Sequence, residues 1–513
     1  MLKGKSASVK YIETANLLLL DSLRVTALYT GFMPAFHIEH FGCRAARADG
    51  EAVSERLLSA GLGQRTPTEA DVVVVNTCSV TAEADRAARA FIRRTHRTNP
   101  AARIVVTGCY AQRAPEELAQ LQGVSAVVGN SHKAFAPEIS LRLATTQDPS
   151  FTTQSSAFVS ICSLLTQSVG ERSVPIWADD RFAHSFLEEA ELLPGTQTRP
   201  NLKIQEGCSN RCTFCVIPQT RGFSRSLPAV TVLRHVREFV AAGGKELVLS
   251  GINLGRWGHD LDKASDTRLS ALARRIFDET ALPRLRLSSI EPMDWNPDLI
   301  SLLRTYGASG RLARHAHLPL QSGSDAVLRR MHRRYRPWHY EEKVWALVQA
   351  AGPMLTLGAD VMAGFPGETD REFEETLDFV RKLPFGYLHL FPFSPRPGTR
   401  GWAFHAESPV LPQAVSERME ALRAVAAEKS LAHRKRFIGH ELAAITLHTS
   451  SDLWAKERST ALSDNFLPIE LHGSHAANSL ISVCVTSVTP EGLLRAKPAC
   501  LPETPSPNAT GRQ

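Results

Sequence analysis

The sequence predicts an α/β protein with an N-terminal parallel α/β domain, a central partial (β/α) barrel and a small C-terminal β-barrel. Short apolar runs alternate with amphipathic helical segments over residues 35–136 and again over 200–435, the pattern of parallel strands joined by helices. Residues 436–500 carry several short strand-like runs instead. A chain of 513 residues, 43% of them apolar, is long enough for about three packed domains.

The first unit, residues 35–136, is expected to be a parallel α/β domain. Strands are expected at Phe36–Phe41, Asp71–Val75 and Arg103–Thr107, and helices at Asp49–Leu58, Ala82–Arg94 and Pro115–Leu121. The run Asp71–Val75 is almost wholly apolar, as in a strand that is buried on both faces of a parallel sheet. Residues 137–199 are rich in Ser, Thr and Gln and are expected to form a linker or insertion.

The second unit, residues 200–435, repeats the alternation. Strands are expected at Leu247–Ser250, Leu285–Ser289, His317–Leu320, Leu357–Met362 and Leu388–Phe391, with helices such as Val230–Ala242 and Asp370–Lys382 between them. Such barrels bind ligands at the carboxyl ends of their strands. The third unit, 436–500, is expected to hold strands at Glu441–His448, Pro468–Leu471, Ile481–Ser487 and Leu493–Ala496.

Both ends of the chain are expected to lie outside the folded domains. Residues 501–513 are rich in Pro and Ser, which predicts a disordered tail. Residues 1–34 form an extension whose apolar run, Leu17–Leu20, is too short for a signal peptide. Met33 directly precedes the first expected strand, so the true start could lie there.

Composition favours a cytoplasmic protein with an anionic partner. Nine cysteines in so long a chain do not make a disulfide framework, which points to a reducing compartment. The formal charge of +7 suits a partner such as RNA. No apolar stretch approaches the roughly 18 residues of a membrane span, so no membrane association is expected.

Cys208, Cys212 and Cys215 form a C-x3-C-x2-C motif. Three thiolates on one short loop can bind three irons of a [4Fe–4S] cluster and leave the fourth iron open to a substrate or cofactor. A zinc site or three unrelated thiols are the alternatives. Zinc sites usually pair such a motif with a second pair of ligands, and no such pair follows here.

Cys43, Cys78 and Cys109 each follow one of the expected strands of the first unit. Parallel strands share one carboxyl edge, where ligand sites gather, so these thiolates could converge on a second three-cysteine cluster. Three buried free cysteines would explain the same residues. The pattern alone leaves both interpretations open.

The two cysteine sets, together with several longer motifs, resemble the methylthiotransferase family of radical S-adenosylmethionine (SAM) enzymes. The resemblance covers about residues 35 to 500 and rests on Asn76-Thr77-Cys78, Thr107–Tyr110, Lys203–Cys215, Pro319–Ser324, Gly364–Thr369 and Phe393–Thr399. It implies an N-terminal cluster domain, a radical SAM barrel and a C-terminal TRAM domain, a small RNA-binding barrel, to which Thr460–Phe466 is similar.

The family's chemistry implies two [4Fe–4S] clusters, with SAM bound at the Cys208, Cys212 and Cys215 cluster. One SAM methylates a sulfur at the N-terminal cluster, and a second supplies the radical that removes a hydrogen from the substrate carbon. The cofactors carry this chemistry, so no catalytic residue beyond their ligands is expected. The expected partners are a tRNA anticodon stem-loop and an electron donor such as flavodoxin or ferredoxin, and the chain is expected to be a monomer.

Six residues are expected to contact SAM: Gly244, Glu246, Ser289, Glu291, Gln321 and Gly364. A glycine lets the backbone approach a ligand, and a carboxylate pairs with an ammonium group. An ordinary glycine turn, a surface glutamate or a polar strand end would explain them as well. Arg330, Arg333, Arg334 and Tyr335 are candidate RNA contacts, because arginines beside an aromatic ring suit phosphates and bases. A solvated helix end explains the same run.

The family has branches that act on threonylcarbamoyladenosine in tRNA, on isopentenyladenosine in tRNA and on an aspartate of a ribosomal protein. Val80–Asp85 and Arg333-Arg334-Tyr335 are similar to the threonylcarbamoyl branch, which implies transfer to C2 of that adenosine at position 37. Ala46 departs from the asparagine usual in the family. An iron–sulfur electron carrier or RNA-binding protein without catalysis is the alternative of another class.

Overall fold

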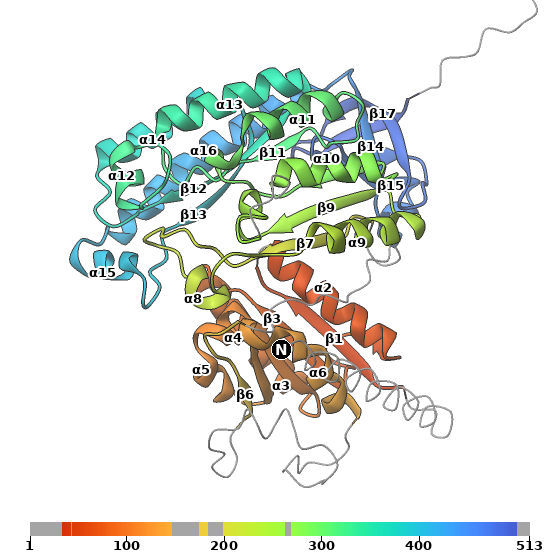
Figure 1. Ribbon diagram of the computed structural model, residues 1–513, viewed down its shortest axis with the longest axis vertical. Helices are drawn as coiled ribbons and strands as arrows, with labels where there is room; N and C mark the ends of the chain where they lie inside the picture. The colour runs from red at the N-terminus through yellow and green to blue at the C-terminus, as the bar shows by residue number, and fades with distance from the viewer. Residues whose placement is uncertain (1–32, 43, 146–173, 183–197, 262–267, 500–513) are drawn as a thin grey trace, which may run out of the picture. The chain divides into compact units, whose positions relative to one another are not determined.

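The computed structural model of the chain describes residues 33–42, 44–145, 174–182, 198–261 and 268–499 (Figure 1). The chain divides into two compact units. The first consists of Met1–Glu191, Glu206–Asn210 and Val216–Phe223, and the second of Leu192–Gln205, Arg211–Cys215 and Ser224–Gln513. No helix among the described residues is long and apolar enough to cross a membrane.

The first unit is built on a parallel sheet with the strand order β2-β1-β3-β4-β5-β6. Its strands are β1 (Ala35–His40), β2 (Gly63–Gln64), β3 (Val72–Thr77), β4 (Arg103–Gly108), β5 (Val124–Gly129) and β6 (Ile176–Trp177). Because β1 lies between β2 and β3, the strand order reverses at this point. The carboxyl ends of β1 and β3 therefore form a topological switch point, where open α/β sheets bind their ligands.

Helices cover both faces of this sheet. They are α2 (Arg44–Ser59), α3 (Ala82–Thr98), α4 (Cys109–Arg113), α5 (Pro115–Ala119), η1 (Asn130–Phe135), α6 (Ala136–Thr145) and α8 (Ile217–Arg221). Val53 of α2 and Leu141 of α6 pack in the core on one face, whereas Phe91 of α3 and Leu118 of α5 pack on the other. Val72–Val75 are fully buried between the two layers, which explains their continuous apolar run.

The strands and helices expected before residue 122 are present, but the linker expected at 137–199 is wrong where the structure describes it. α6 continues to Thr145, and β6 pairs with β5. Sequence reasoning misses α6 because its buried face includes Ser140, whose hydroxyl donates to the Ala136 carbonyl at 2.7 Å. Residues 146–173 and 183–197 lie outside the described part of the chain, as do 1–32 and the tail expected at 501–513.

The second unit contains the central partial barrel. Its strands are β7 (Asn201–Glu206), β8 (Arg225–Ser226), β9 (Glu246–Gly251), β10 (Arg284–Leu287), β11 (His315–His317), β12 (Thr356–Ala363) and β13 (Phe385–Pro392). They form the sheets β10-β9-β7-β8 and β11-β12-β13, which a parallel bridge between Leu285 and Leu312 connects. β7 and β9–β13 run parallel, so their carboxyl ends lie along one edge, where such barrels bind ligands.

Helices connect these strands, as the sequence predicts. They are η2 (Leu254–Arg256), α9 (Ala229–Ala241), α10 (Leu269–Glu279), η3 (Pro292–Asp294), α11 (Pro297–Gly307), α12 (Asp325–Arg330), α13 (Pro337–Ala351), η4 (Gly352–Met354), α14 (Asp370–Lys382), α15 (Arg400–Glu407) and α16 (Pro412–Lys435). α14 has the expected bounds because Thr369 and Glu372 form a capping box at its start.

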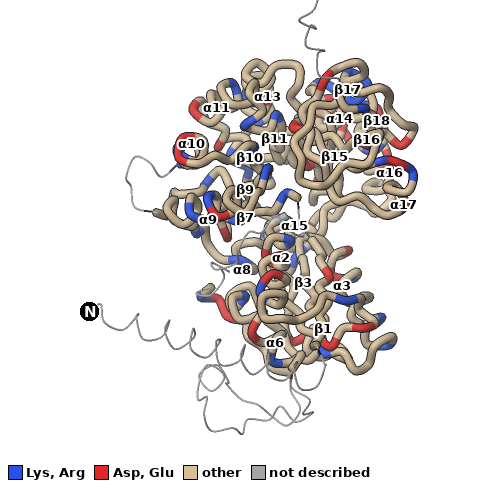
Figure 2. The backbone as a smooth tube through the Cα atoms, turned by 90° about the vertical axis from the view of Figure 1, so that its right-hand side faces the viewer, with Lys and Arg blue, Asp and Glu red and all other residues tan. Residues whose placement is uncertain are grey.

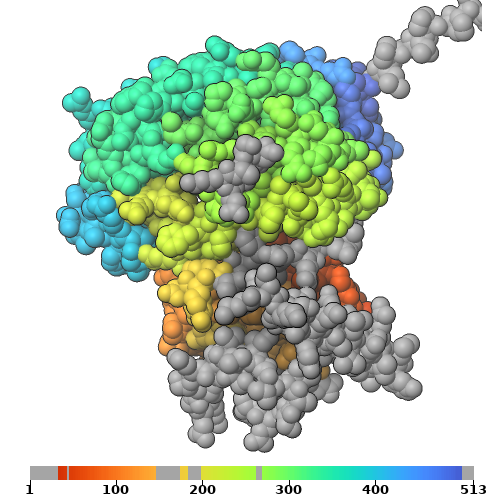
Figure 3. Space-filling model, in the orientation of Figure 1, coloured from red at the N-terminus to blue at the C-terminus, as the bar shows by residue number. Residues whose placement is uncertain are grey.

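The C-terminal residues of the second unit form a closed barrel with the strand order β14-β15-β16-β18-β17. Its elements are β14 (Glu441–Thr446), α17 (Ser451–Trp454), β15 (Arg458–Ser463), β16 (Pro468–His472), β17 (Leu480–Val488) and β18 (Leu494–Pro498). Its blue atoms adjoin the green atoms of the central barrel in Figure 3, and Arg314 forms an ion pair with Asp464 at 2.5 Å. The expected fold class is confirmed.

Sequence reasoning misses one strand of this barrel, β15. Its buried positions include Ser459 and Ser463, so the strand lacks the apolar alternation that marks a half-buried strand. Both serines satisfy their hydroxyls inside the barrel. Ser459 donates to the Gly473 carbonyl at 2.6 Å, and Ser463 accepts from the Leu467 amide at 2.8 Å.

Candidate active site

Two cysteines of the first unit, Cys78 and Cys109, lie at the carboxyl edge of its sheet. Cys78 directly follows β3, and Cys109 directly follows β4. Cys43 lies outside the described residues, but its neighbour Gly42 packs against Cys78, since a Cβ on Gly42 would lie 2.5 Å from that of Cys78. The structure thus brings Cys78 and Cys109 to the switch-point edge, as the sequence predicts.

Two side chains donate hydrogen bonds to the sulfur of Cys109. Nε of Arg221 lies 3.2 Å from Sγ, and Nδ2 of Asn130 lies 3.4 Å from it. The sulfur of Cys78 accepts from the Val80 amide at 3.5 Å. Donors of this kind, above all a guanidinium, favour a sulfur that carries negative charge, as a thiolate bound to iron does.

Arg221 belongs to a buried network of four charged residues. Its Nη1 donates to Glu206 at 2.7 Å and to Asp49 at 3.1 Å, and Lys133 forms ion pairs with the same two carboxylates. All four side chains are at most 3% exposed. Sequence reasoning misses this network, although the opposite charges of Glu206 and Arg221 on the two sides of the cysteine motif are a signal for it.

Gly207 allows the chain to turn sharply from β7 into the cysteine motif. Its φ of +70° lies in the left-handed region, and a Cβ there would come within 2.1 Å of the Phe223 carbonyl oxygen. The turn is closed by a hydrogen bond from the Cys208 amide to the Gly222 carbonyl at 3.0 Å. The Asn210 amide also donates to the Cys208 sulfur at 3.4 Å. No other residue type fits this position without moving the backbone.

Replacing Gly207 by alanine is expected to lower the free energy of unfolding and to reduce the iron bound per chain after cluster reconstitution. A matched control is Gly310→Ala, because Gly310 also has a positive φ, +74°, but has open space around its Cα. We expect a loss of about 1 kcal/mol for the control, the cost of left-handed backbone alone, and a larger loss for G207A. Equal iron content and equal stability in the two variants would contradict the steric argument.

Cys212 and Cys215 belong to the part of the loop that groups with the second unit. Three hydrogen bonds hold Thr213, which lies between them. Its amide donates to the Met331 carbonyl at 3.1 Å, and its hydroxyl donates to the Arg330 carbonyl at 3.0 Å. Its own carbonyl accepts from the Gly401 amide at 2.7 Å. Arg333 donates from Nη1 to the Cys212 sulfur at 3.1 Å. The end of α12, the residues that follow it and the start of α15 therefore position this half of the motif.

This geometry corrects the expectation that Arg333 and Tyr335 contact RNA. Both side chains are buried; Arg333 binds Glu291 at 2.7 and 2.5 Å, and the Tyr335 hydroxyl donates to the carbonyl of Leu320 at 2.6 Å. Burial alone would lower the pKa of Arg333, but Glu291 and Cys212 hold it well above its usual range. Arg330 is half-buried and forms an ion pair with Glu372 at 2.8 Å. Of the four candidate RNA contacts, only Arg334 is exposed.

The helix that leads into the C-terminal barrel, α16, carries residues of both charges along most of its length. Basic and acidic residues alternate along most of α16 (Figure 2), whereas its last turn carries His433, Arg434 and Lys435. Arg418 on this helix is buried and forms ion pairs with Glu368 at 2.9 Å and Asp370 at 2.7 Å. Among the candidate RNA contacts, Arg330 and Arg334 are therefore the two whose side chains, 35% and 41% exposed, a phosphate can reach.

Four of the six expected SAM contacts lie at the carboxyl edge of the central barrel. Ser289 and Glu291 follow β10, Gln321 bridges to Val361 of β12, and Gly364 follows β12. Gln321 has an unusual φ of +69° for a residue other than glycine. Strain of this kind gathers at ligand sites.

Three buried polar atoms at this edge have no hydrogen-bond partner among the described residues. They are the hydroxyls of Ser250 and Ser288 and the amide oxygen Oε1 of Gln321, which come from three consecutive strand ends. An unsatisfied buried polar atom is costly, and a bound polar ligand removes that cost. The edge therefore fits a ligand rich in hydroxyl and amino groups, such as SAM.

The expectation that Gly244 and Glu246 contact SAM is wrong. Glu246 is the first residue of β9, so it lies at the amino end of the strand, opposite the cysteine loop. Its fully buried carboxylate binds Arg286 at 2.7 Å, Arg284 at 3.3 Å and Arg199 at 3.5 Å. Burial opposes ionisation, but these guanidiniums lower the pKa of Glu246 to about 2. Gly244 is needed instead for packing, since a Cβ there would lie 2.2 Å from the Phe239 ring.

The two units match known families separately. Residues 35–129 match the uncharacterized protein family UPF0004, and residues 202–380 match the radical SAM superfamily. The chain is 31% identical to the threonylcarbamoyladenosine tRNA methylthiotransferase MtaB of Aquifex aeolicus over 450 residues, which cover 87% of this chain and 99% of the relative. The Bacillus subtilis protein of the same name is 33% identical over 443 residues, 86% of this chain and 90% of the relative.

A relative with another name is nearly as similar. The tRNA-2-methylthio-N(6)-dimethylallyladenosine synthase of Novosphingobium aromaticivorans is 32% identical over 412 residues, 79% of this chain and 84% of the relative. The fold and the cysteine loop thus define a radical SAM enzyme. The chain belongs to the radical SAM methylthiotransferase family, of the MtaB type, and is an enzyme that transfers methylthio groups. The expected family is confirmed.

Proposed function

We propose that this enzyme adds a methylthio group to C2 of N6-threonylcarbamoyladenosine at position 37 of tRNA, with two [4Fe–4S] clusters and SAM. The observation that carries the proposal is the pair of cysteine sets, of which Cys109 and Cys212 each accept a hydrogen bond from a buried arginine. The names of the relatives from Aquifex aeolicus and Bacillus subtilis support this substrate.

Cys43, Cys78 and Cys109 would hold the first cluster. The donor set fits, because soft thiolates select iron–sulfur clusters and the Cys109 sulfur receives two N–H donors. Arg221 and Asn130 would stabilise the negative charge on that sulfur. Gly42 would let the backbone pass close to Cys78.

Cys208, Cys212 and Cys215 would hold the second cluster and leave one iron for SAM. When bound, the cluster and SAM supply the radical that takes a hydrogen atom from an unactivated C–H bond. The chain's own part is to orient SAM with Ser250, Ser288 and Gln321, whose polar atoms lie buried at the barrel edge. Arg333 would hold Cys212 through its donor bond, with Glu291 fixing the guanidinium. An electron donor of the flavodoxin or ferredoxin class would serve this site, and the chain would act as a monomer.

The experiment that tests the substrate is nucleoside mass spectrometry of tRNA from cells that lack their own enzyme, with and without this chain. We expect 2-methylthio-N6-threonylcarbamoyladenosine to appear. A methylthio group on isopentenyladenosine instead would support the proposed reaction but overturn the proposed substrate. This nucleoside is the second candidate substrate, because the chain is also similar to a dimethylallyladenosine synthase. No modified nucleoside would overturn tRNA as the substrate and direct the search to a ribosomal protein.

Cysteine variants test the assignment of the two clusters. Cys212→Ala is expected to abolish the formation of 5′-deoxyadenosine from SAM, whereas Cys109→Ala should retain it and lose only methylthio transfer. Each variant should bind about half the wild-type iron, because each removes one ligand of one cluster. Loss of SAM cleavage in C109A would contradict the division of roles. Wild-type protein that never cleaves SAM with its iron in place would support an electron carrier without catalysis.

A further inference from the structure

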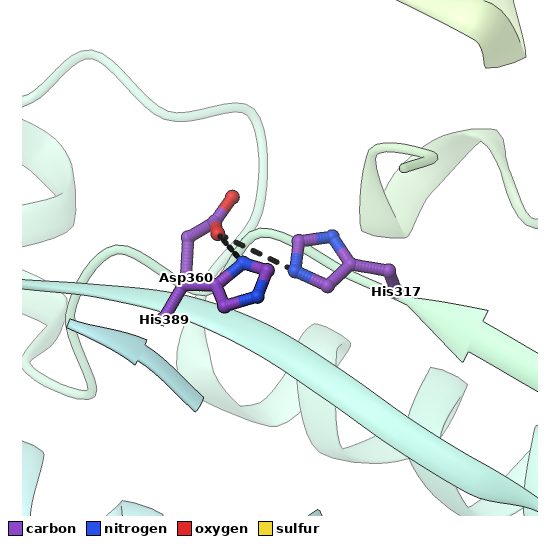
Figure 4. Close-up of side chains that lie close together, drawn as sticks. All are labelled: His317, Asp360 and His389. Carbon is purple, nitrogen blue, oxygen red and sulfur yellow. Dashed lines mark hydrogen bonds and ion pairs between the residues drawn. The ribbon is translucent and has the colours of Figure 1, made fainter. Parts of the chain in front are cut away.

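Three adjacent strands of the central barrel bring two histidines and an aspartate together. His317 ends β11, Asp360 lies in β12 and His389 lies in β13, where it is the register partner of Asp360. Figure 4 shows both imidazole rings directed at the same carboxylate oxygen. Oδ1 of Asp360 lies 3.3 Å from Nε2 of His317 and 3.3 Å from Nδ1 of His389.

The rest of the barrel fixes the orientation of these rings. The hydroxyl of Ser289 lies 2.7 Å from Nδ1 of His317 and accepts from it when Nδ1 carries the proton. That tautomer leaves the lone pair of Nε2 free on the side of Asp360, as in histidines that bind metals. The ring of His317 also stacks on Tyr387, with centroids 5.9 Å apart. Because Gly358 has no side chain, Tyr387 can lie over β12 beside Asp360.

The three ligand atoms lie within 4.8 Å of one another, and the two distances to Asp360 are long for strong hydrogen bonds. A charge-assisted bond from an imidazolium to a carboxylate is normally about 2.7–2.9 Å long, shorter than both contacts here. Ligand atoms 3.3 Å apart, each about 2.0–2.1 Å from a zinc ion, subtend about 105° at the metal, close to the tetrahedral angle. Two imidazoles and a carboxylate are also a common ligand set for zinc.

We propose that His317, Asp360 and His389 form a binding site for a divalent transition metal, with zinc as the best match. His317 is buried and Asp360 is 24% exposed, whereas His389 is 62% exposed, so the site opens to one side. An oxygen donor entering from that side, such as water or a carboxylate, would complete the coordination. This site uses none of the cysteines and does not depend on the proposed substrate.

The test uses the full-length, cluster-reconstituted protein, freed of loose metal and then dialysed against zinc sulfate. We expect about one zinc per chain, with a first shell of nitrogen and oxygen near 2.0–2.1 Å and imidazole scattering in the zinc X-ray absorption spectrum. A sulfur shell near 2.3 Å would place the zinc on cysteines and overturn the proposal. Absence of bound zinc would overturn it as well, in favour of a hydrogen-bonded His–Asp–His group without metal.

Matched variants separate this site from other histidines. His389→Gln removes an exposed ligand without disturbing the core, and Asp360→Asn keeps the shape but removes the charge. Each should weaken zinc binding at least about tenfold, while iron content remains at the wild-type level. The control is His448→Gln, because His448 is exposed and lies in the C-terminal barrel. Unchanged zinc affinity in H389Q would overturn the proposal, even if D360N failed to fold.

Discussion

Replacing Arg221 by methionine is expected to lower the free energy of unfolding of the cluster-free chain by about 3–5 kcal/mol, the usual cost of breaking a buried ion pair. The guanidinium is fully buried and binds Glu206 at 2.7 Å and Asp49 at 3.1 Å. Methionine fills similar space without charge, so it leaves two buried carboxylates that share Lys133. Denaturant unfolding followed by circular dichroism measures the difference.

The control for this prediction is Arg86→Met. Arg86 pairs with Glu83, but both side chains are well exposed, at 64% and 75%. Exposed pairs of this kind contribute about 0–1 kcal/mol, so R86M should unfold almost as the wild type does. If R221M were as stable as R86M, the buried network would not stabilise the first unit.

Arg221→Lys separates the charge of this residue from its bond to Cys109. Lysine keeps a cation near Glu206 and Asp49 but cannot reproduce the guanidinium fork. We expect R221K to unfold closer to the wild type than R221M does. Hydrogen bonds to cluster sulfurs raise the reduction potential, so the first cluster should have a lower potential in R221K.

The sequence predicts much of the scaffold because buried parallel strands have a strong local signature. Val72–Val75 are apolar without interruption since helices cover both faces of their sheet. Cys78 and Cys109 could be placed at one edge from the order of strands and helices alone. Among the strands that escape prediction, β15 buries Ser459 and Ser463 in satisfied hydrogen bonds, which no pattern of hydrophobicity shows.

The charged partners of the site could not be predicted from the sequence, because they are distant along the chain. Arg221 and Cys109 are separated by 112 positions, and Arg333 and Cys212 by 121. A run of arginines looks the same in sequence whether it faces solvent or a buried carboxylate. Burial decides between these cases, and for Arg333 the partner Glu291 comes from a different strand end.

The error at Glu246 has a different origin. The sequence already places this residue before a strand, and ligands of such barrels bind at the other end. Glu246 begins β9, so the direction of the strand already places it at the end of the barrel away from the ligand. The carboxylate instead lies among Arg199, Arg284 and Arg286, and the last of these also donates to Ser463 of the C-terminal barrel at 3.1 Å. Glu246 is thus part of the contact between the two barrels.

Glu246 is therefore expected to make the stability of the second unit depend on pH. Its pKa in the folded chain is lowered from 4.5 to about 2, so the ionised form stabilises the fold above pH 4.5, and this contribution is lost as the pH falls from there toward 2. A shift of this size corresponds to about 3 kcal/mol.

Glu246→Gln should be less stable than the wild type by about 3 kcal/mol at pH 7, because a neutral amide cannot balance the buried guanidiniums. Urea unfolding of the cluster-free chains between pH 7 and pH 3 measures how the difference changes. We expect it to shrink as the pH falls below 4.5, since the wild-type carboxylate then becomes protonated in the unfolded chain. The control Glu374→Gln alters an exposed residue of α14 and should show no difference from the wild type. A difference between E246Q and the wild type that stayed constant over this range would show that the amide disturbs packing rather than charge.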